Sequence, residues 1–156
     1  MIPPLDTYIF KTSIASYNIV LGDIILQLTG KVSDIRIVDS ERKKKENSVR
    51  ATGLANRIGE VTVVMNYWNI QCTEGLYYGE GRGEITSKES GDKVKVTEYG
   101  VGRVHGQKSM WRGSTFYQSL QASVDSKLYS LHGLVGVFET EVDEAGNVIE
   151  KVWEWK

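Results

Sequence analysis

The chain has 156 residues, of which 40% are hydrophobic and 25% charged, and this balance is ordinary for one soluble globular domain spanning residues 1–156. Its 19 basic and 20 acidic residues give a formal net charge of −1, so we expect neither a nucleic-acid partner nor a membrane partner. The one cysteine, Cys72, excludes an intramolecular disulfide and a cysteine-ligated zinc cluster, and a lone thiol favours a cytoplasmic location. The N-terminal residues show no secretory signal pattern, and no apolar run approaches the ~20 residues that span a bilayer.

The first part of the chain predicts a leading segment, a hairpin and a loop. Residues 1–18 are expected to form a tail or an edge strand. Residues 23–29 and 32–39 are rich in Ile, Leu and Val, which predicts two strands joined by a turn at 30–31. The run 41–46 mixes basic with acidic residues, and this compensation favours a solvated loop over a nucleic-acid patch.

Alternating patterns continue through the rest of the chain. Predicted strands cover 48–55, 59–70, 76–87, 93–103, 109–119, 128–142 and 148–155. No segment shows the 3.6-residue period of a helix. Sequential strands joined by short turns predict an all-β fold, an antiparallel, mostly up-and-down closed barrel of eight to ten strands. A β-sandwich is the alternative, but the many glycines inside strands favour the barrel because tightly coiled strands need such positions.

One predicted strand carries three glycines at every second position. Because strand side chains alternate, Gly79, Gly81 and Gly83 share one face, and the row from Tyr78 to Glu84 forms the other. The glycine face lets a neighbouring element approach, and the charged face is suited to line a lumen. A shift of one residue inverts such an assignment, so the pattern leaves open which face points inward.

Five short motifs carry a resemblance to a known kind of protein. They are Tyr78-Gly-Glu-Gly-Arg-Gly83, Gly100-Val-Gly-Arg103, Trp111-Arg-Gly113, Gly136-Val-Phe-Glu139 and Lys151-Val-Trp-Glu-Trp-Lys156. Over residues 22–156 the chain resembles an uncharacterised family of small prokaryotic proteins, which itself looks like the allene-oxide-cyclase-like and calycin-like barrels. This resemblance implies an eight-stranded barrel; barrels of this shape hold small apolar ligands, run cyclisations or have no identified activity, so the resemblance implies the fold and not one function. No residue set matches the cyclases' catalytic motif, so no catalytic residue is assigned.

The charged face of the glycine strand supplies the first candidate site. If Glu80 and Arg82 point into the lumen, Glu80 can meet Arg112 from another long strand, with Tyr78 or Tyr117 nearby. Such a pair would orient a polar ligand, or serve as a general acid with its orienting group. The alternative is an outward-facing ladder of charges, which contributes only a few tenths of a kcal/mol per pair.

Aromatic residues and a histidine supply further candidates. Several aromatic side chains, among them Tyr67, Trp111 and Phe138, line a hydrophobic pocket or fill the barrel. His132 lies on an apolar strand face, which favours a hydrogen-bonded core histidine over a base or a ligand-binding group. The candidate ligand-binding residues are Tyr67, Tyr78, Glu80, Arg82, Arg112, Tyr117 and His132. With two histidines and no phosphate-binding loop, we expect neither a metal nor a cofactor.

Three functions remain open at this point. The first is a calycin-like barrel that binds a small apolar or amphipathic ligand. The second is a cofactor-free isomerase or cyclase of the allene-oxide-cyclase-like type that uses Glu80, Arg112 and a tyrosine. The third is a packed, homo-oligomeric barrel whose outer surface is the functional part. A cavity of a few hundred Å³ with Glu80 or Arg112 on its wall would separate them.

Overall fold

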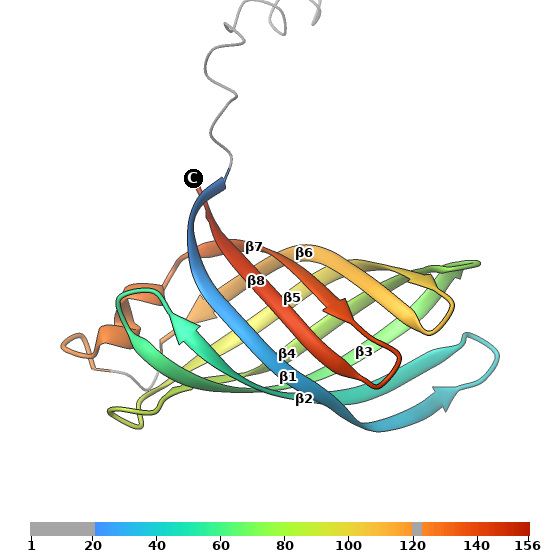
Figure 1. The fold of residues 1–156 in the computed structure, drawn as a ribbon, viewed down its shortest axis with the longest axis horizontal. Coiled ribbons are helices and arrows are strands. Elements are labelled where there is room, and N and C mark those ends of the chain that lie inside the picture. The colour runs from blue at the N-terminus through green and yellow to red at the C-terminus, as the bar shows by residue number, and fades with distance from the viewer. Residues whose placement is uncertain (1–20, 120–122) are drawn as a thin grey trace, which may run out of the picture.

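The computed structural model describes residues 21–119 and 123–156, so the predicted tail or edge strand at 1–18 lies outside the described residues. Within these ranges eight antiparallel strands follow one another around a closed barrel (Figure 1). The strands are β1 (Leu21–Asp39), β2 (Lys44–Ala55), β3 (Gly59–Thr73), β4 (Leu76–Ser87), β5 (Lys93–His105), β6 (Lys108–Gln118), β7 (Val135–Val142) and β8 (Asn147–Trp155). β1 also pairs with β8, from Leu21 opposite Trp155 to Lys31 opposite Asn147. This closure confirms the predicted up-and-down barrel and excludes the β-sandwich.

The turn predicted at 30–31 is wrong, because β1 continues through it as a single long strand. Gly30 pairs with Ala51 on β2 and with Val148 on β8. A side chain at this glycine would lie 2.3 Å from the backbone oxygen of Arg50. Gly30 therefore allows a close approach of two strands and does not reverse the chain.

The strand predicted to begin at residue 128 is also wrong in its first half. Lys127–Leu131 form a short 3-10 helix, η2, and β7 begins only at Val135. The side chain of Ser126 caps η2 by accepting a hydrogen bond from the backbone N–H of Leu128. Leu128 and Leu131 are both buried, so the helix presents an apolar face to the barrel.

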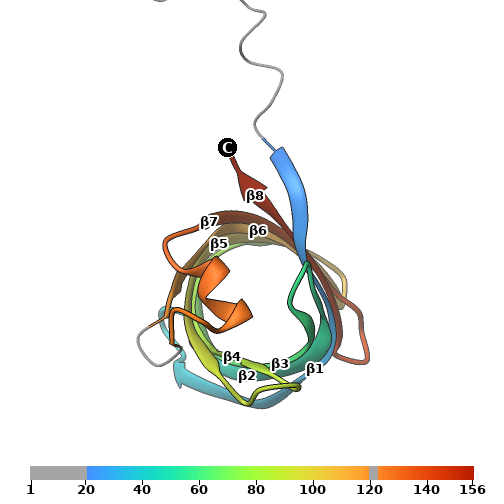
Figure 2. The ribbon, with the colours of Figure 1, turned by 90° about the vertical axis from the view of Figure 1, so that its left-hand side faces the viewer.

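One end of the barrel is closed by these apolar side chains. Figure 2 looks into this end and shows η2 lying across the opening. Leu128 and Leu131 of η2 and Ile58 of the β2–β3 turn belong to the same buried cluster as Val61 and Val94. The described residues contain no helix that is both long enough and apolar enough to cross a membrane.

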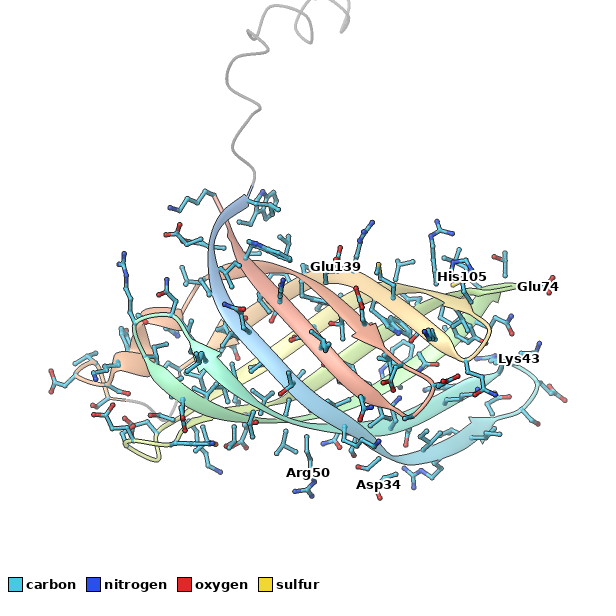
Figure 3. All side chains as sticks on the ribbon, in the orientation of Figure 1. Asp34, Lys43, Arg50, Glu74, His105 and Glu139 are labelled. Carbon is cyan, nitrogen blue, oxygen red and sulfur yellow. The ribbon has the colours of Figure 1, made fainter. Side chains whose placement is uncertain are left out.

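The inward and outward faces of β4 can now be assigned. Gly79 and Gly81 are buried and border the lumen, whereas Arg82 is exposed. The charged row that includes Glu80 and Arg82 therefore covers the outside of the barrel. Other outward positions behave alike, and Figure 3 shows Arg50 and Glu139 pointing away from the barrel wall.

Candidate functional site

The half of the barrel opposite η2 encloses a cavity of about 490 Å³. It reaches the end at which β5 joins β6 and β7 joins β8, because Gln107 and Gly146 of those turns contribute to its wall. Figure 1 shows these turns at the right-hand end, away from η2. The lumen therefore has a filled half and an open half, and the open half is the candidate site.

Glycines inside the barrel let aromatic rings lie flat against its wall. A Cβ at Gly81 would lie 2.2 Å and 2.4 Å from the Cε1 and Cδ1 atoms of Tyr67. A Cβ at Gly102 would lie 2.5–2.6 Å from three atoms of the Trp111 indole, and one at Gly100 would lie 2.8 Å from Phe138. The rings occupy the space that side chains would otherwise fill. The glycines thereby leave room in the lumen for these rings, and Tyr67, Trp111 and Phe138 all line the cavity.

Two glutamates form the polar floor of this cavity. The Tyr67 hydroxyl donates a hydrogen bond of 2.6 Å to Oε2 of Glu98. The Thr140 hydroxyl donates one of the same length to Oε2 of Glu150. Glu98 and Glu150 are only 4% and 8% exposed, and both lie on the cavity wall. Each carboxyl group is therefore held in place by one neutral donor in a largely dry environment.

Burial keeps these two carboxyl groups protonated to unusually high pH. It raises the pKa of Glu98 well above its ordinary value, and the negative charge of Glu150 raises that pKa further. The hydrogen bond from Tyr67 acts in the opposite direction but does not cancel the effect. Burial likewise raises the pKa of Glu150, although the bond from Thr140 opposes it. Because the two negative charges repel each other in a dry site, simultaneous ionisation of both carboxyl groups is disfavoured.

Buried polar atoms without partners adjoin the floor. Thr115 pairs with Glu98 across the β5–β6 ladder, is fully buried, and its Oγ1 has no hydrogen-bond partner among the described residues. The hydroxyl of Tyr117, on the same inward face of β6, also has no hydrogen-bond partner among the described residues. Asn47 of β2 lines the cavity itself and its Oδ1 is also unpartnered. Such atoms are rare in folded proteins; Asn47 Oδ1 is the one of these three that lines the cavity, and a further unpartnered atom, Oγ of Ser119, lies beside His132 at the closed end.

The structure separates the predicted site residues into two groups. Tyr67 lies on the cavity floor, and the buried Tyr117 lies in the same interior. Glu80 and Arg112 do not form the lumenal pair that the sequence suggested. Glu80 accepts a hydrogen bond from Tyr78 at 2.9 Å, and Arg112 instead forms an ion pair with Glu139 at 2.9 Å.

The reason for this correction is the direction of the glycine strand. Because the glycines of β4 face inward, Tyr78, Glu80 and Arg82 must face outward. Arg112 lies outward on β6, on the opposite face from Trp111. None of these four predicted residues lines the cavity.

His132 has a structural place at the closed end of the barrel. Its Nδ1 accepts a hydrogen bond of 2.9 Å from the backbone N–H of Ser119, and its ring stacks on Tyr129 at 5.2 Å. It is the exposed residue that follows η2, and it does not line the cavity. The prediction of a core histidine on an apolar strand face is therefore wrong, because this segment forms η2 and leaves the hydrogen-bonded His132 exposed.

Sequence reasoning missed Glu98 and Glu150, although a signal for both is present. Glu98 follows Val94 and Val96 on one face of β5, and Glu150 lies between Val148 and Val152 on one face of β8. An acidic residue at an inward position among valines must be buried with the valines if the strand alternates. That pattern would have identified both glutamates as lumenal.

The described residues contain no group of three or more His, Cys, Asp or Glu side chains that could hold a metal ion. Neither a protein-family model nor a curated protein sequence matches this chain. Among solved structures, the chain is similar to a crystal structure of a protein with unknown function from Clostridium acetobutylicum ATCC 824. The two are 12% identical and superpose with a TM-score of 0.67, over 86% of this chain and 98% of the clostridial one. At that identity the likeness extends to the fold alone.

Proposed function

We propose that the protein binds a small amphipathic molecule in the open half of its lumen. The single observation that supports this most strongly is the cavity of about 490 Å³ with Glu98 and Glu150 on its wall. A volume of this size is within the range of small-molecule sites, and convergent polar groups at one end of an apolar pocket are typical of them. The likeness to calycin-like barrels noted from sequence supports the same proposal.

The two ends of the ligand would meet different surfaces. Val49, Trp111 and Phe138 offer an apolar wall for the body of the molecule. The carboxyl groups of Glu98 and Glu150 offer the hydrogen-bonding end, and their partners Tyr67 and Thr140 fix their orientation. Glycines at 81, 100 and 102 keep the wall free of other side chains. A bound molecule would therefore lie along the lumen with its polar end toward the floor.

A second candidate function is a cofactor-free isomerase or cyclase, as in the allene-oxide-cyclase-like barrels. A carboxyl group whose pKa is raised by burial is suited to donate or accept a proton near neutral pH. Glu98 is such a group, and it faces the cavity next to a tyrosine hydroxyl. Turnover of the bound molecule, lost in Glu98→Gln while binding persists, would distinguish this function from simple binding.

Native mass spectrometry of the protein purified from its own host tests the binding function. We expect part of the protein to carry excess mass. Denaturation should release that mass as a small molecule. In Val49→Trp the new side chain would project into the cavity, and the excess mass should disappear. Val64→Trp is the matched control, because Val64 is 41% exposed on the outer face of β3. Retention of the same molecule by Val49→Trp, or its absence from the wild type, would contradict the proposal.

A further inference from the structure

The floor of the cavity has acceptors for hydrogen bonds but no positive charge. Ion pairs among residues 21–119 and 123–156 involve neither Glu98 nor Glu150. Two lysines, Lys45 and Lys108, line the cavity, but so do two acidic residues of the β7–β8 turn, Asp143 and Glu144. These four charges cancel formally, so the net charge of the site is set by how far Glu98 and Glu150 are ionised.

The strands around the pair contribute no cation to the floor. β3 contributes Tyr67, β6 contributes Tyr117 and β7 contributes Thr140, while β4 contributes only Gly81. From β2 the nearest polar group on the cavity wall is Asn47, and the lumenal residues of β1 are apolar or glycine. The titratable groups that face the pair are thus two tyrosines and the two carboxyl groups themselves.

Two hydroxyl donors on the floor are already in use, and at least one acceptor on the cavity wall is free. The Tyr67 and Thr140 hydroxyl hydrogens both go to the carboxyl groups. The Oδ1 atom of Asn47 lines the cavity, has no partner among the described residues and can only accept, whereas the unpartnered hydroxyls of Thr115 and Tyr117 can donate or accept. A ligand with hydrogen-bond donors would match Asn47 and the two carboxyl groups, and a positive charge on it would balance their ionised form.

We propose that the ligand of this lumen is a small organic cation, a primary or secondary amine. Its ammonium group would donate hydrogen bonds to Glu98, Glu150 and Asn47, and its apolar body would lie on Trp111 and Phe138. This inference rests on the proposed binding function and names the chemistry of its ligand.

Binding of an amine must compete with protons for the same carboxyl groups. Because burial raises the pKa of Glu98 and Glu150, the free pair carries bound protons to higher pH than ordinary glutamates do. An ammonium ion stabilises the ionised form, so its arrival releases a proton to the solvent. The measured enthalpy should then differ between phosphate and Tris at pH 7, since the two buffers take up a proton with different heats.

Calorimetry with three matched probes tests this inference on the wild-type protein. The probes are 2-phenylethylamine, 2-phenylethanol and 3-phenylpropionate, which share an apolar body and differ in charge; hexylamine, 1-hexanol and heptanoate form a second series. We expect the amine to bind at least tenfold more tightly than the alcohol, and the carboxylate most weakly. The double variant Glu98→Gln/Glu150→Gln keeps the side-chain shapes and the acceptors for Tyr67 and Thr140. It should lose at least tenfold in affinity for the amine and little for the alcohol.

The outcomes separate this inference from the binding function itself. If the alcohol binds as tightly as the amine, or the double variant keeps its amine affinity, the lumen is a binding site but not one for cations. If the amine binds with the same heat in both buffers, binding does not release a proton from the carboxyl pair, and this part of the inference is overturned. If no member of either series binds, the binding function is overturned along with the inference.

Discussion

Tyr67 and Glu98 lie on strands that are not neighbours, and their hydrogen bond of 2.6 Å passes over Gly81 of the strand between them. In the barrel register Tyr67 is opposite Gly81, and Gly81 is opposite Glu98. The missing side chain at position 81 leaves the space through which the tyrosine ring reaches the carboxyl group. The glycine strand thus serves the polar floor of the lumen, and the following predictions depend on this arrangement.

The substitution Gly81→Ala should disrupt the floor. Its Cβ would lie 2.2 Å from the Tyr67 ring, so the ring must move, and we expect a loss of about 1–3 kcal/mol in the free energy of unfolding. Denaturant unfolding measures this loss.

In a Tyr67→Ala background the same glycine substitution should cost less, by about 1 kcal/mol or more, because the clash is gone. Gly22→Ala is a control, because there the nearest atom is the flexible Lys156 side chain. Equal costs of Gly81→Ala in both backgrounds would contradict the arrangement.

The substitution Tyr67→Phe removes one hydroxyl and keeps the ring. Glu98 then loses its donor in a buried site, and we expect a loss of about 1–3 kcal/mol in stability. Since that hydrogen bond lowers the pKa of Glu98, its removal should also raise this pKa further. The matched control is Tyr78→Phe, which removes a tyrosine–glutamate bond from the outside of the barrel and should cost less. Unfolding curves of both variants decide the matter, and a larger loss in Tyr78→Phe would refute the prediction.

The two lumenal glutamates should make the protein less stable as pH rises. Their pKa values are raised in the folded state, whereas glutamate in the unfolded chain titrates at about pH 4.3. Between that pH and the raised pKa values, the folded state binds more protons than the unfolded state. Stability is then fully present below the unfolded pKa and falls through that window, by up to ~1.4 kcal/mol per pH unit for each extra proton. Unfolding free energies at pH 5–8 should fall more steeply in the wild type than in Glu98→Gln/Glu150→Gln. Parallel curves would show that the two groups titrate normally.

The strands and their closure were predictable because they rest on local signals. Alternation of apolar residues, short turns and the glycines inside strands indicated an antiparallel closed barrel, and the structure confirms it. The first half of the segment at 128–142 was misread, because Leu128, Leu131 and Leu134 also fit the three-residue spacing of a 3-10 helix. At this position two periods compete, and tertiary packing at the barrel end decides between them.

The site was less predictable than the fold. Glycine is neither clearly apolar nor polar, so the hydropathy pattern does not show whether the glycine face of this strand points into the barrel or out of it. The charged row at Glu80 and Arg82 could therefore be assigned to either side of the wall. Glu98 and Glu150 are far apart in the sequence, and only the order of the strands around the barrel brings them to one lumen. Tyr67 was identified as a candidate from its aromatic character, but its partner follows only from the register.

A crystal structure of the protein with bound 2-phenylethylamine is the most direct measurement of the central claim. It should place the molecule in the half of the lumen opposite η2, with its nitrogen within hydrogen-bond distance of Glu98 or Glu150 and its phenyl ring against Trp111. An amine found on the outer wall, or one lying in the lumen with its nitrogen turned away from both carboxyl groups, would contradict the account.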